Sequence, residues 1–452
     1  MPDYMSASLL YATHYLQVLY TQNKGYWDGG KEQAGSLRNF DIEFSNVLFA
    51  RNKLPDLIAR INKKQKLSGI DLALLDICNA FPDAGAYLIS VKLNATERIR
   101  WLHDALQASQ KLKNNITTQA HLGNLGLAYY QLGELSPATE YFSQAFQLAE
   151  QIGDKYHQGA WLGNLGNIYA LMGDHERAIE YHERHLGLMR EIKDARGEGH
   201  ALANLGVSYA YLGNVSKAIE NYKQFLDLAI KNGDRREESQ ALMNLGFAYF
   251  DVGDLDSASS SLKSALEITV ELGDRSTQSL VMGGLADVAI DRKEYRNAIR
   301  TLNEAIDILQ EAYDVESELR LIQSLGNAYS ASEDYDNALK TFSRLYTLAD
   351  ATGAKAAMCS ALVNQTSIYR EKGDLARAMK IGEKGLDLAI EIHSLSNEAF
   401  VRWQVGLIYE ASGELTKAIG EMETAVKIEA RIESVEVEQH QIYFRNITQN
   451  IT

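Results

Sequence analysis

A short motif returns every 40 residues along most of this chain, and no other feature constrains the fold as strongly. Its clearest copies are Leu-Gly-Asn-Leu-Gly or close variants, at residues 122–126, 162–166, 202–206 and 242–246. Weaker copies keep the same register, at residues 282–286, 322–326, 362–366 and 402–406. Eight copies at constant spacing indicate a repeat array, in which each unit buries its apolar face against its neighbours.

Other positions keep the same period. Seven copies are followed after three residues by Tyr, with Ala289 as the exception, and alanine recurs in every copy at the column that starts with Ala138. Small residues such as Gly126 and Ala138 let two helices approach closely. Gly-Asp pairs, of which Gly153-Asp154 is one, combine a C-cap glycine with an N-cap acid for the next helix. Each unit is therefore predicted to be a helical hairpin.

These columns resemble the tetratricopeptide repeat, with matches in the second copy at Leu165, Gly166, Tyr169 and Ala178. The 40-residue spacing is similar to that of the LGN/Pins family of spindle-orientation adaptors and of bacterial regulatory proteins. The resemblance covers about three quarters of the chain. It implies an all-α solenoid, a right-handed superhelix of helical hairpins, which binds a peptide or partner protein in its concave groove.

Three regions are expected. Residues 1–93 form a degenerate N-terminal helical region, and residues 94–432 form the array, with eight clear repeats from about residue 117 after one degenerate helix. Residues 433–452 form a C-terminal capping helix or tail. The spacing of Asn94 and Glu97 predicts a capping box at the start of the degenerate helix.

Upstream of the array, apolar periodicity predicts one helix around residues 9–19 and another over Phe40–Arg51, with a glycine-rich loop between them at Gly25–Gly35. The run from Phe40 to Asn46 resembles the segment before the repeat sensor of STAND-type signalling ATPases. This resemblance implies an alternative function, as the ligand-sensing module of a bacterial STAND-type or quorum-type signalling system.

Charge and composition limit the classes of partner that we expect. The net charge of −15 is carried by the repeats, because residues 1–113 hold 14 Lys and Arg against 11 Asp and Glu, whereas the remainder holds 31 against 49. Such an acidic surface repels phosphate backbones, so no nucleic acid is expected as a partner. Neither a long apolar run nor a basic signal-peptide start occurs, so we expect no membrane span and a cytoplasmic location.

Candidate ligand-binding residues come from the resemblance. In the tetratricopeptide family, first helices line the groove, and the residue before the Leu-Gly pair points into it. Here that column is rich in amides, which can hydrogen-bond the backbone of an extended peptide. The alternative is that these amides bond within the array or to water. The predicted peptide-binding set is Asn124, Asn164, Asn167, Asn204, Asn244, Phe247, Asn327, Asn364, Arg320 and Arg370.

Further along the array, the acidic side chains Asp251, Asp287 and Asp291 favour a ligand with some Lys or Arg.

No catalytic residue, cofactor or metal site is predicted. The pair His182 and His185 does not have the spacing of a zinc motif and occupies columns that are apolar elsewhere, so we predict that it packs in the interior. Homo-oligomerisation through the ends of the array is a further possibility.

Overall fold

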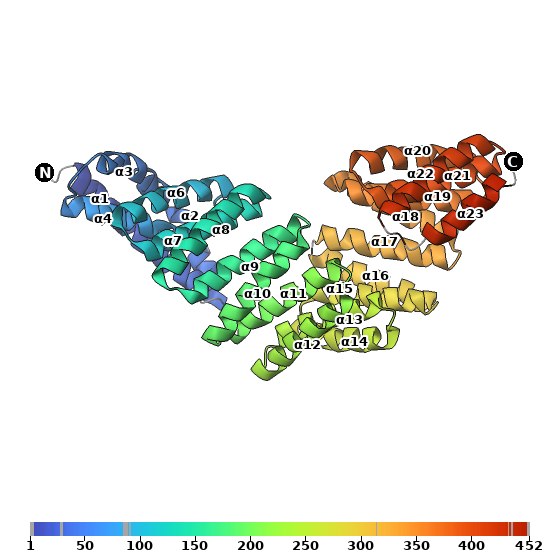
Figure 1. Cartoon of the computed structure of the whole chain (residues 1–452). Coiled ribbons are helices and arrows are strands. Elements are labelled where there is room, and N and C mark those ends of the chain that lie inside the picture. The colour runs from blue at the N-terminus through green and yellow to red at the C-terminus, as the bar shows by residue number, and fades with distance from the viewer. Residues whose placement is uncertain are drawn as a thin grey trace. The chain divides into compact units, whose positions relative to one another are not determined.

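The computed structural model describes residues 4–27, 30–84, 89, 92–312, 314–432, 434 and 437–449. These segments consist of helices joined by short turns, and no strand occurs among them (Figure 1). The chain divides into two compact units, Met1–Leu228 and Ala229–Thr452, which are described separately. Within the described segments, no helix combines the length and the apolar character needed to cross a membrane.

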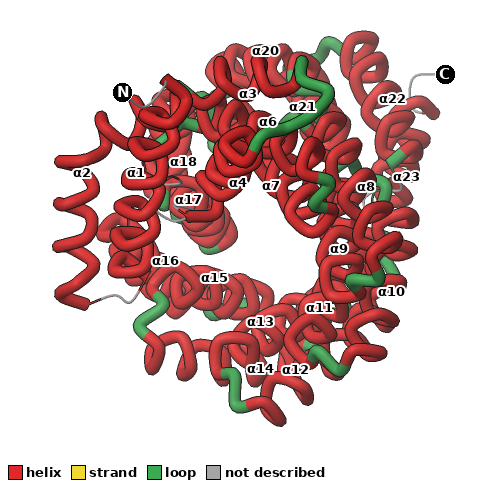
Figure 2. Tube along the Cα trace, turned by 90° about the vertical axis from the view of Figure 1, so that its left-hand side faces the viewer, coloured by secondary structure: helices red, strands yellow, loops and turns green. Residues whose placement is uncertain are grey.

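Eight helical hairpins occupy the predicted repeats, one hairpin for each 40 residues, with tight turns between their helices (Figure 2). In the first unit their helices are α7 (Asn115–Gln131), α8 (Leu135–Ile152), α9 (Lys155–Leu171), α10 (His175–Ile192), α11 (Ala195–Tyr211) and α12 (Val215–Asn232), which contains the boundary between the units. The helices of the second unit are α13 (Arg235–Asp251), α14 (Leu255–Leu272), α15 (Arg275–Asp291), α16 (Tyr295–Ala312), α17 (Val315–Ala331), α18 (Tyr335–Thr352), α19 (Lys355–Glu371), α20 (Leu375–Glu391), α21 (Leu395–Ala411) and α22 (Leu415–Arg431).

The Gly-Asp pairs work as predicted. Gly153 ends α8 in the left-handed conformation, with φ 74°, and the Asp154 carboxylate accepts a hydrogen bond from the His157 amide at 3.2 Å. The same C-cap and N-cap pair recurs at Gly273 and Asp274. These caps satisfy backbone groups that would otherwise be left without partners where one helix ends and the next begins.

Packing inside six of the eight hairpins depends on a glycine that faces one large residue. The glycine of the first helix lies against a large side chain of the second helix, so that a Cβ added to the glycine would come within 2.3–2.8 Å of that side chain. The pairs are Gly126 with Phe142, Gly166 with His182, Gly206 with Tyr222, Gly246 with Leu262, Gly326 with Phe342 and Gly406 with Met422. The seventh hairpin reverses this arrangement, since Thr366 on α19 faces Gly382 on α20.

The N-terminal helices are α1 (Tyr4–Trp27), α2 (Gly30–Asn52), α3 (Leu54–Asn62), α4 (Gly69–Ala84) and α6 (Ala95–Leu112). Asn94 caps α6 by accepting a hydrogen bond from the Glu97 amide at 2.9 Å, which is the N-cap half of the predicted capping box. The predicted loop over Gly25–Gly35 is wrong, because helix covers all of this span except residues 28–29, which lie outside the described residues. α1 and α2 pack as a pair and bury Leu19, Phe40 and Val47, and this burial outweighs the low helix propensity of glycine.

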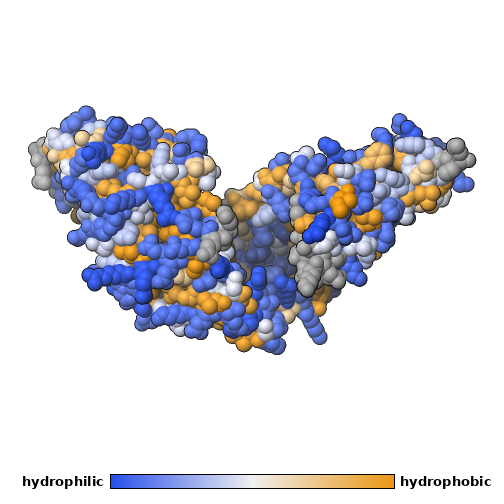
Figure 3. Space-filling model, turned by 180° about the vertical axis from the view of Figure 1, so that it is seen from behind, coloured by the Kyte–Doolittle hydropathy of each residue, from blue (hydrophilic) through white to orange (hydrophobic). Residues whose placement is uncertain are grey.

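At the other end of the chain, α23 (Val437–Gln449) packs on α22. Its Phe444 and Ile447 lie against a buried cluster of Trp403, Met422 and Ala425. Elsewhere on the surface, hydrophobic residues are interspersed among hydrophilic ones, as the face drawn in Figure 3 shows. The division of the chain at residues 93/94 and 432/433 stays a prediction.

Candidate functional site

Three of the predicted amides meet in one cavity of the first unit. Asn164 and Asn167 come from α9 and Asn204 comes from α11, and both helices pack against α10. The cavity has a volume of about 650 Å³. We call it the amide cavity; its walls are Tyr156, Ala160, Gly163, Asn164, Asn167, His185, Met189, Ile192, Asp194, Arg196, Gly197, His200 and Asn204.

A hydrogen bond orients two of these amides. The Asn204 side chain donates from Nδ2 to Oδ1 of Asn167, with 3.0 Å between the two atoms. A carboxamide has two N–H donors and an acceptor oxygen with two lone pairs, so this bond uses part of the capacity of each group. The structure therefore contains the bond within the array that was the alternative to peptide binding, and both amides still line the cavity.

The second helix of the hairpin, α10, contributes His185 and Met189 to the wall. Glycines on the neighbouring helices make room for both, because a Cβ at Gly163 would lie 3.0 Å from His185 Nδ1 and a Cβ at Gly197 would lie 2.3 Å from Met189 Sδ. Burial, together with the neighbouring His200, lowers the pKa of His185 to about 4, so the imidazole is neutral at pH 7. This wall of the cavity is therefore uncharged.

His182, one turn before His185, is buried against Gly166 of α9. Burial also lowers its pKa to about 4. Both histidines thus occupy the packed interior, which confirms the packing prediction for the pair. His185 in addition reaches the cavity wall, which the prediction did not include.

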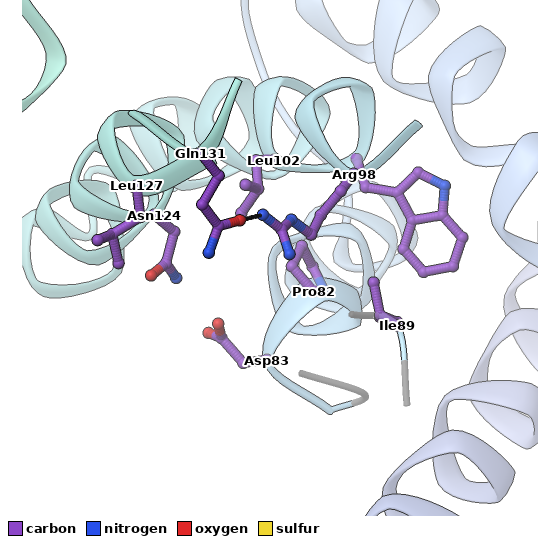
Figure 4. A pocket seen from close by; sticks show the side chains of 9 residues that line it. Pro82, Asp83, Ile89, Arg98, Leu102, Asn124, Leu127 and Gln131 are labelled. Atoms are coloured by element: carbon purple, nitrogen blue, oxygen red, sulfur yellow. Dashed lines mark hydrogen bonds between the residues drawn. The ribbon is translucent and has the colours of Figure 1, made fainter. Parts of the chain in front are cut away.

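Asn124 lies elsewhere in the first unit, in a smaller pocket of about 170 Å³ between α4, α6 and α7. Figure 4 shows its side chain beside Leu127, with Arg98 hydrogen-bonded to Gln131 in the same pocket. Asn124 is therefore not among the residues that form the amide cavity.

The predicted residues of the second unit have individual partners. Asn244 accepts a hydrogen bond from Gln240 at 3.1 Å, and Asn364 donates to the Ser360 carbonyl at 2.8 Å. Phe247 packs over Gly284, whose missing side chain leaves space for the ring. Arg320 and Asn327 are exposed on α17.

Arg370 donates from Nε to Gln404 Oε1 at 2.8 Å and lines a pocket with it, described below. Among the acidic side chains of the array, Asp287 is perturbed: burial raises its pKa to about 6, although a hydrogen bond with Ser324 opposes the rise.

Comparison with protein families identifies the repeat. Tetratricopeptide repeat models match residues 118–152, 156–231, 204–269, 237–311 and 274–351, and together they cover slightly more than half of the chain. The chain is a tetratricopeptide repeat protein. A model described as anaphase-promoting complex subunit 5 also matches residues 326–400, within the same array. No curated protein sequence matches the chain.

Solved structures confirm the tetratricopeptide fold. The apo form of the quorum sensor NprR from B. thuringiensis is 17% identical with a TM-score of 0.54, and the match covers 79% of this chain and 96% of that one. Aspartyl phosphate phosphatase F from Bacillus subtilis is 12% identical with a TM-score of 0.53, covering 85% and 95%. A STAND protein with a tetratricopeptide repeat sensor from Pyrococcus horikoshii is 16% identical with a TM-score of 0.53, covering 86% of this chain and 65% of that one.

The tetratricopeptide pattern alone could not identify the whole amide cavity. Tyr156, Met189 and Ile192 were missed because they lie at helix ends or on second helices, outside the column that the family uses. One signal was available in the sequence. The second copy has glycine at both 159 and 163, and Gly197 begins the next helix, so three side chains are absent around one place.

Proposed function

We propose that this tetratricopeptide array is a receptor for an extended peptide segment of a partner protein, and that the amide cavity grips the backbone of that segment. The observation that carries the proposal is the convergence of Asn164, Asn167 and Asn204 on one cavity of about 650 Å³. Peptide backbones offer alternating N–H and C=O groups, and a carboxamide can pair with both.

Part of the cavity wall suits an apolar side chain of the same peptide. Ala160, Met189 and Ile192 provide aliphatic surface, and Tyr156 stands 57% exposed at the wall. Flexible thioethers and exposed aromatic rings are frequent at peptide-binding surfaces, since they adapt to the bound side chain. Amides for the backbone and apolar surface for one anchor fit a peptide better than a charged small molecule.

A second candidate is a sensor module, in which ligand binding changes the array and so signals to a partner. Its support is that a quorum sensor and the repeat sensor of a STAND protein share the fold over 79% and 86% of this chain. Arrays whose repeats contact only their neighbours can change curvature when a ligand binds. A sensor and a receptor use the same groove, so the same experiment addresses both.

The test is a pull-down from native lysate with the wild-type chain and with the Asn164→Ala, Asn204→Ala double variant. A matched control is Asn221→Ala, because Asn221 is a partly exposed asparagine of α12 that bonds to the Lys217 carbonyl and lies outside the cavity. We expect a specific protein to be lost by the double variant and kept by the control.

A synthetic peptide covering the captured segment should then bind at least tenfold more weakly to the double variant, since each lost hydrogen bond contributes roughly 0.5–1.5 kcal/mol. Circular dichroism confirms that helix content is unchanged. An identical partner list for all three proteins contradicts the proposal.

A further inference from the structure

A second pocket lies wholly within the second unit, near the C-terminal end of the array. It has a volume of about 300 Å³ and is formed by α19, α21, α22 and α23. Its apolar wall includes Phe400, Leu407 and Ile432, and its polar wall includes Glu429 and His440. We call it the α21–α23 pocket. It lies outside the amide cavity and shares no residue with it.

Glu429 differs in charge from the residues at the same position of the other repeats. In the other seven repeats its column holds an uncharged buried residue: Ala149, Met189, Ala229, Thr269, Leu309, Ala349 and Ala389. Glu429 is itself only 4% exposed. A carboxylate in a core column is costly unless its oxygens find partners, so packing alone does not account for this residue.

Among the residues that the structure describes, only one oxygen of Glu429 has a partner. Oε1 lies 2.8 Å from Nδ1 of His440, which α23 brings to this position, whereas Oε2 makes no hydrogen bond. The ring of His440 is in turn held by Trp403, since the two rings stack with 3.8 Å between their centroids. The second oxygen is therefore buried without a donor, which is unfavourable for a carboxylate.

The other ionisable group of the pocket is Arg370. Its guanidinium already donates to Gln404 and lies 3.4 Å from the Glu371 carboxylate, so its hydrogen bonds go to these partners. No described residue donates to this oxygen, and a ligand that enters the pocket can supply the donor. A cation suits best, since a charge-assisted hydrogen bond is stronger than a neutral one.

We propose that the α21–α23 pocket binds an organic cation on an apolar stem, an alkylammonium or alkylguanidinium group. Its head donates to Glu429, and its methylenes pack on Phe400, Leu407 and Ile432. Lys and Arg side chains of a bound protein have this construction, and so have free alkylamines.

The first experiment titrates the full chain with n-butylammonium, n-butylguanidinium and the neutral 1-butanol, followed by NMR. We expect either cation to bind at least tenfold more tightly than the alcohol. Glu429→Gln keeps an oxygen that accepts from His440 and removes the charge, so it should weaken cation binding at least tenfold. Glu423→Gln is the matched control, because Glu423 lies on the same helix, exposed and paired with Lys427.

Arg370→Gln provides a test in the opposite direction. It removes the like charge from the pocket, so cation binding should become a few times tighter, an effect that a purely structural Glu429–His440 link does not produce. Two short peptides, acetyl-Gly-Lys-Gly-amide and its norleucine counterpart, distinguish the source of the cation. Tighter binding of the lysine peptide than of n-butylammonium indicates that the cation is a side chain of a partner protein. The reverse order indicates a free amine.

Equal binding of n-butylammonium and 1-butanol, or equal cation binding by wild type and Glu429→Gln with helix content unchanged, overturns the proposal. Neither result bears on the amide cavity, whose residues all belong to the first unit.

Discussion

Two pairs of side chains occupy equivalent positions of the repeat, one in each unit, and differ in chemistry. Asn167 on α9 bonds to Asn204 on α11, and Asp287 on α15 bonds to Ser324 on α17, three repeats later in the same columns. The helices fix where the two groups meet, but the choice of residue decides whether the contact carries a proton that titrates. The repeat thus fixes the positions of the two side chains but not their chemical type.

Buried groups in or beside the two pairs respond to acid in opposite directions. Beside the amide pair, His182 and His185 have their pKa values lowered by burial to about 4. Unfolded histidine titrates near 6.5, so the unfolded chain binds more protons as pH falls from 6.5 to 4, and stability is lost across that window. Asp287, with its pKa raised to about 6, takes up its proton at a higher pH in the folded state than in the unfolded chain. Its contribution to the stability of the folded state therefore increases as pH falls from 6 to 3.8.

The largest expected effect is therefore loss of stability in the second repeat on acidification. Between pH 7 and pH 4.5 we expect α9 and α10 to lose a few kcal/mol of stability, measured by hydrogen exchange corrected for the intrinsic rate at each pH. The double variant His182→Phe, His185→Ala installs the residues of the first repeat, Phe142 and Ala145, and should remove most of this dependence. A double variant as sensitive to acid as the wild type contradicts the assignment.

The next effect concerns the space beside His182. Gly166→Ala places a Cβ about 2.5 Å from the His182 ring and should cost about 1–3 kcal/mol in chemical denaturation. In the same unit, Gly187→Ala is the control, since Gly187 is exposed on α10 with open space around it, and this change should add roughly 0.5–1 kcal/mol. Equal effects of the two substitutions would show that helix propensity, and not packing, dominates here.

A smaller effect should follow when the acidic pair is converted into an amide pair. Asp287→Asn removes a carboxylate that burial disfavours above pH 6, so we expect a gain of about 1 kcal/mol at pH 7 and no gain at pH 4. Urea unfolding at the two pH values measures both. Asp307→Asn, at an exposed position of α16, should change neither, and a gain that is the same at both pH values would argue against titration of Asp287.

The smallest effect concerns the turns that follow α9 and α15. Gly173 ends the first with φ 79°, whereas Lys293 adopts φ 62° after the second, in the left-handed region that side chains disfavour. Lys293→Gly should therefore stabilise the chain by about 1 kcal/mol, and Gly173→Ala should destabilise it by a similar amount. Thermal unfolding measures the change in stability of each variant relative to the wild type, and a loss of stability in Lys293→Gly contradicts the strain argument.

Much of the fold followed from the sequence because each column reports a local requirement. Gly153 and Asp154 need no distant partner to form a cap, so their spacing was sufficient. The helices across Gly25–Gly35 could not be foreseen, because they depend on α1 packing against α2 and not on local propensity. The same limit applies to the candidate site, since Met189 reaches the amide cavity only through space that Gly159 and Gly197 on other helices leave open.

The predicted row of binding residues was informative in part. Asn164, Asn167 and Asn204 share a cavity, while Asn124 lines another pocket and Asn364 bonds to its own helix. The position of a residue within the repeat predicts its place on a helix. Whether it contributes to a site also depends on how much of its surface the neighbouring side chains leave accessible. The absence of catalysis and of cofactors stays a prediction.

The reversed pair of the seventh hairpin, Thr366 facing Gly382, bears on how such an array changes by recombination. A crossover that exchanges a complete hairpin keeps each small residue with its large partner. A crossover at the turn between α19 and α20 would instead join Thr366 to a side chain such as Phe342, or leave Gly382 facing another glycine. The unit of inheritance in this chain is therefore the 40-residue hairpin, and its two helices are not interchangeable parts.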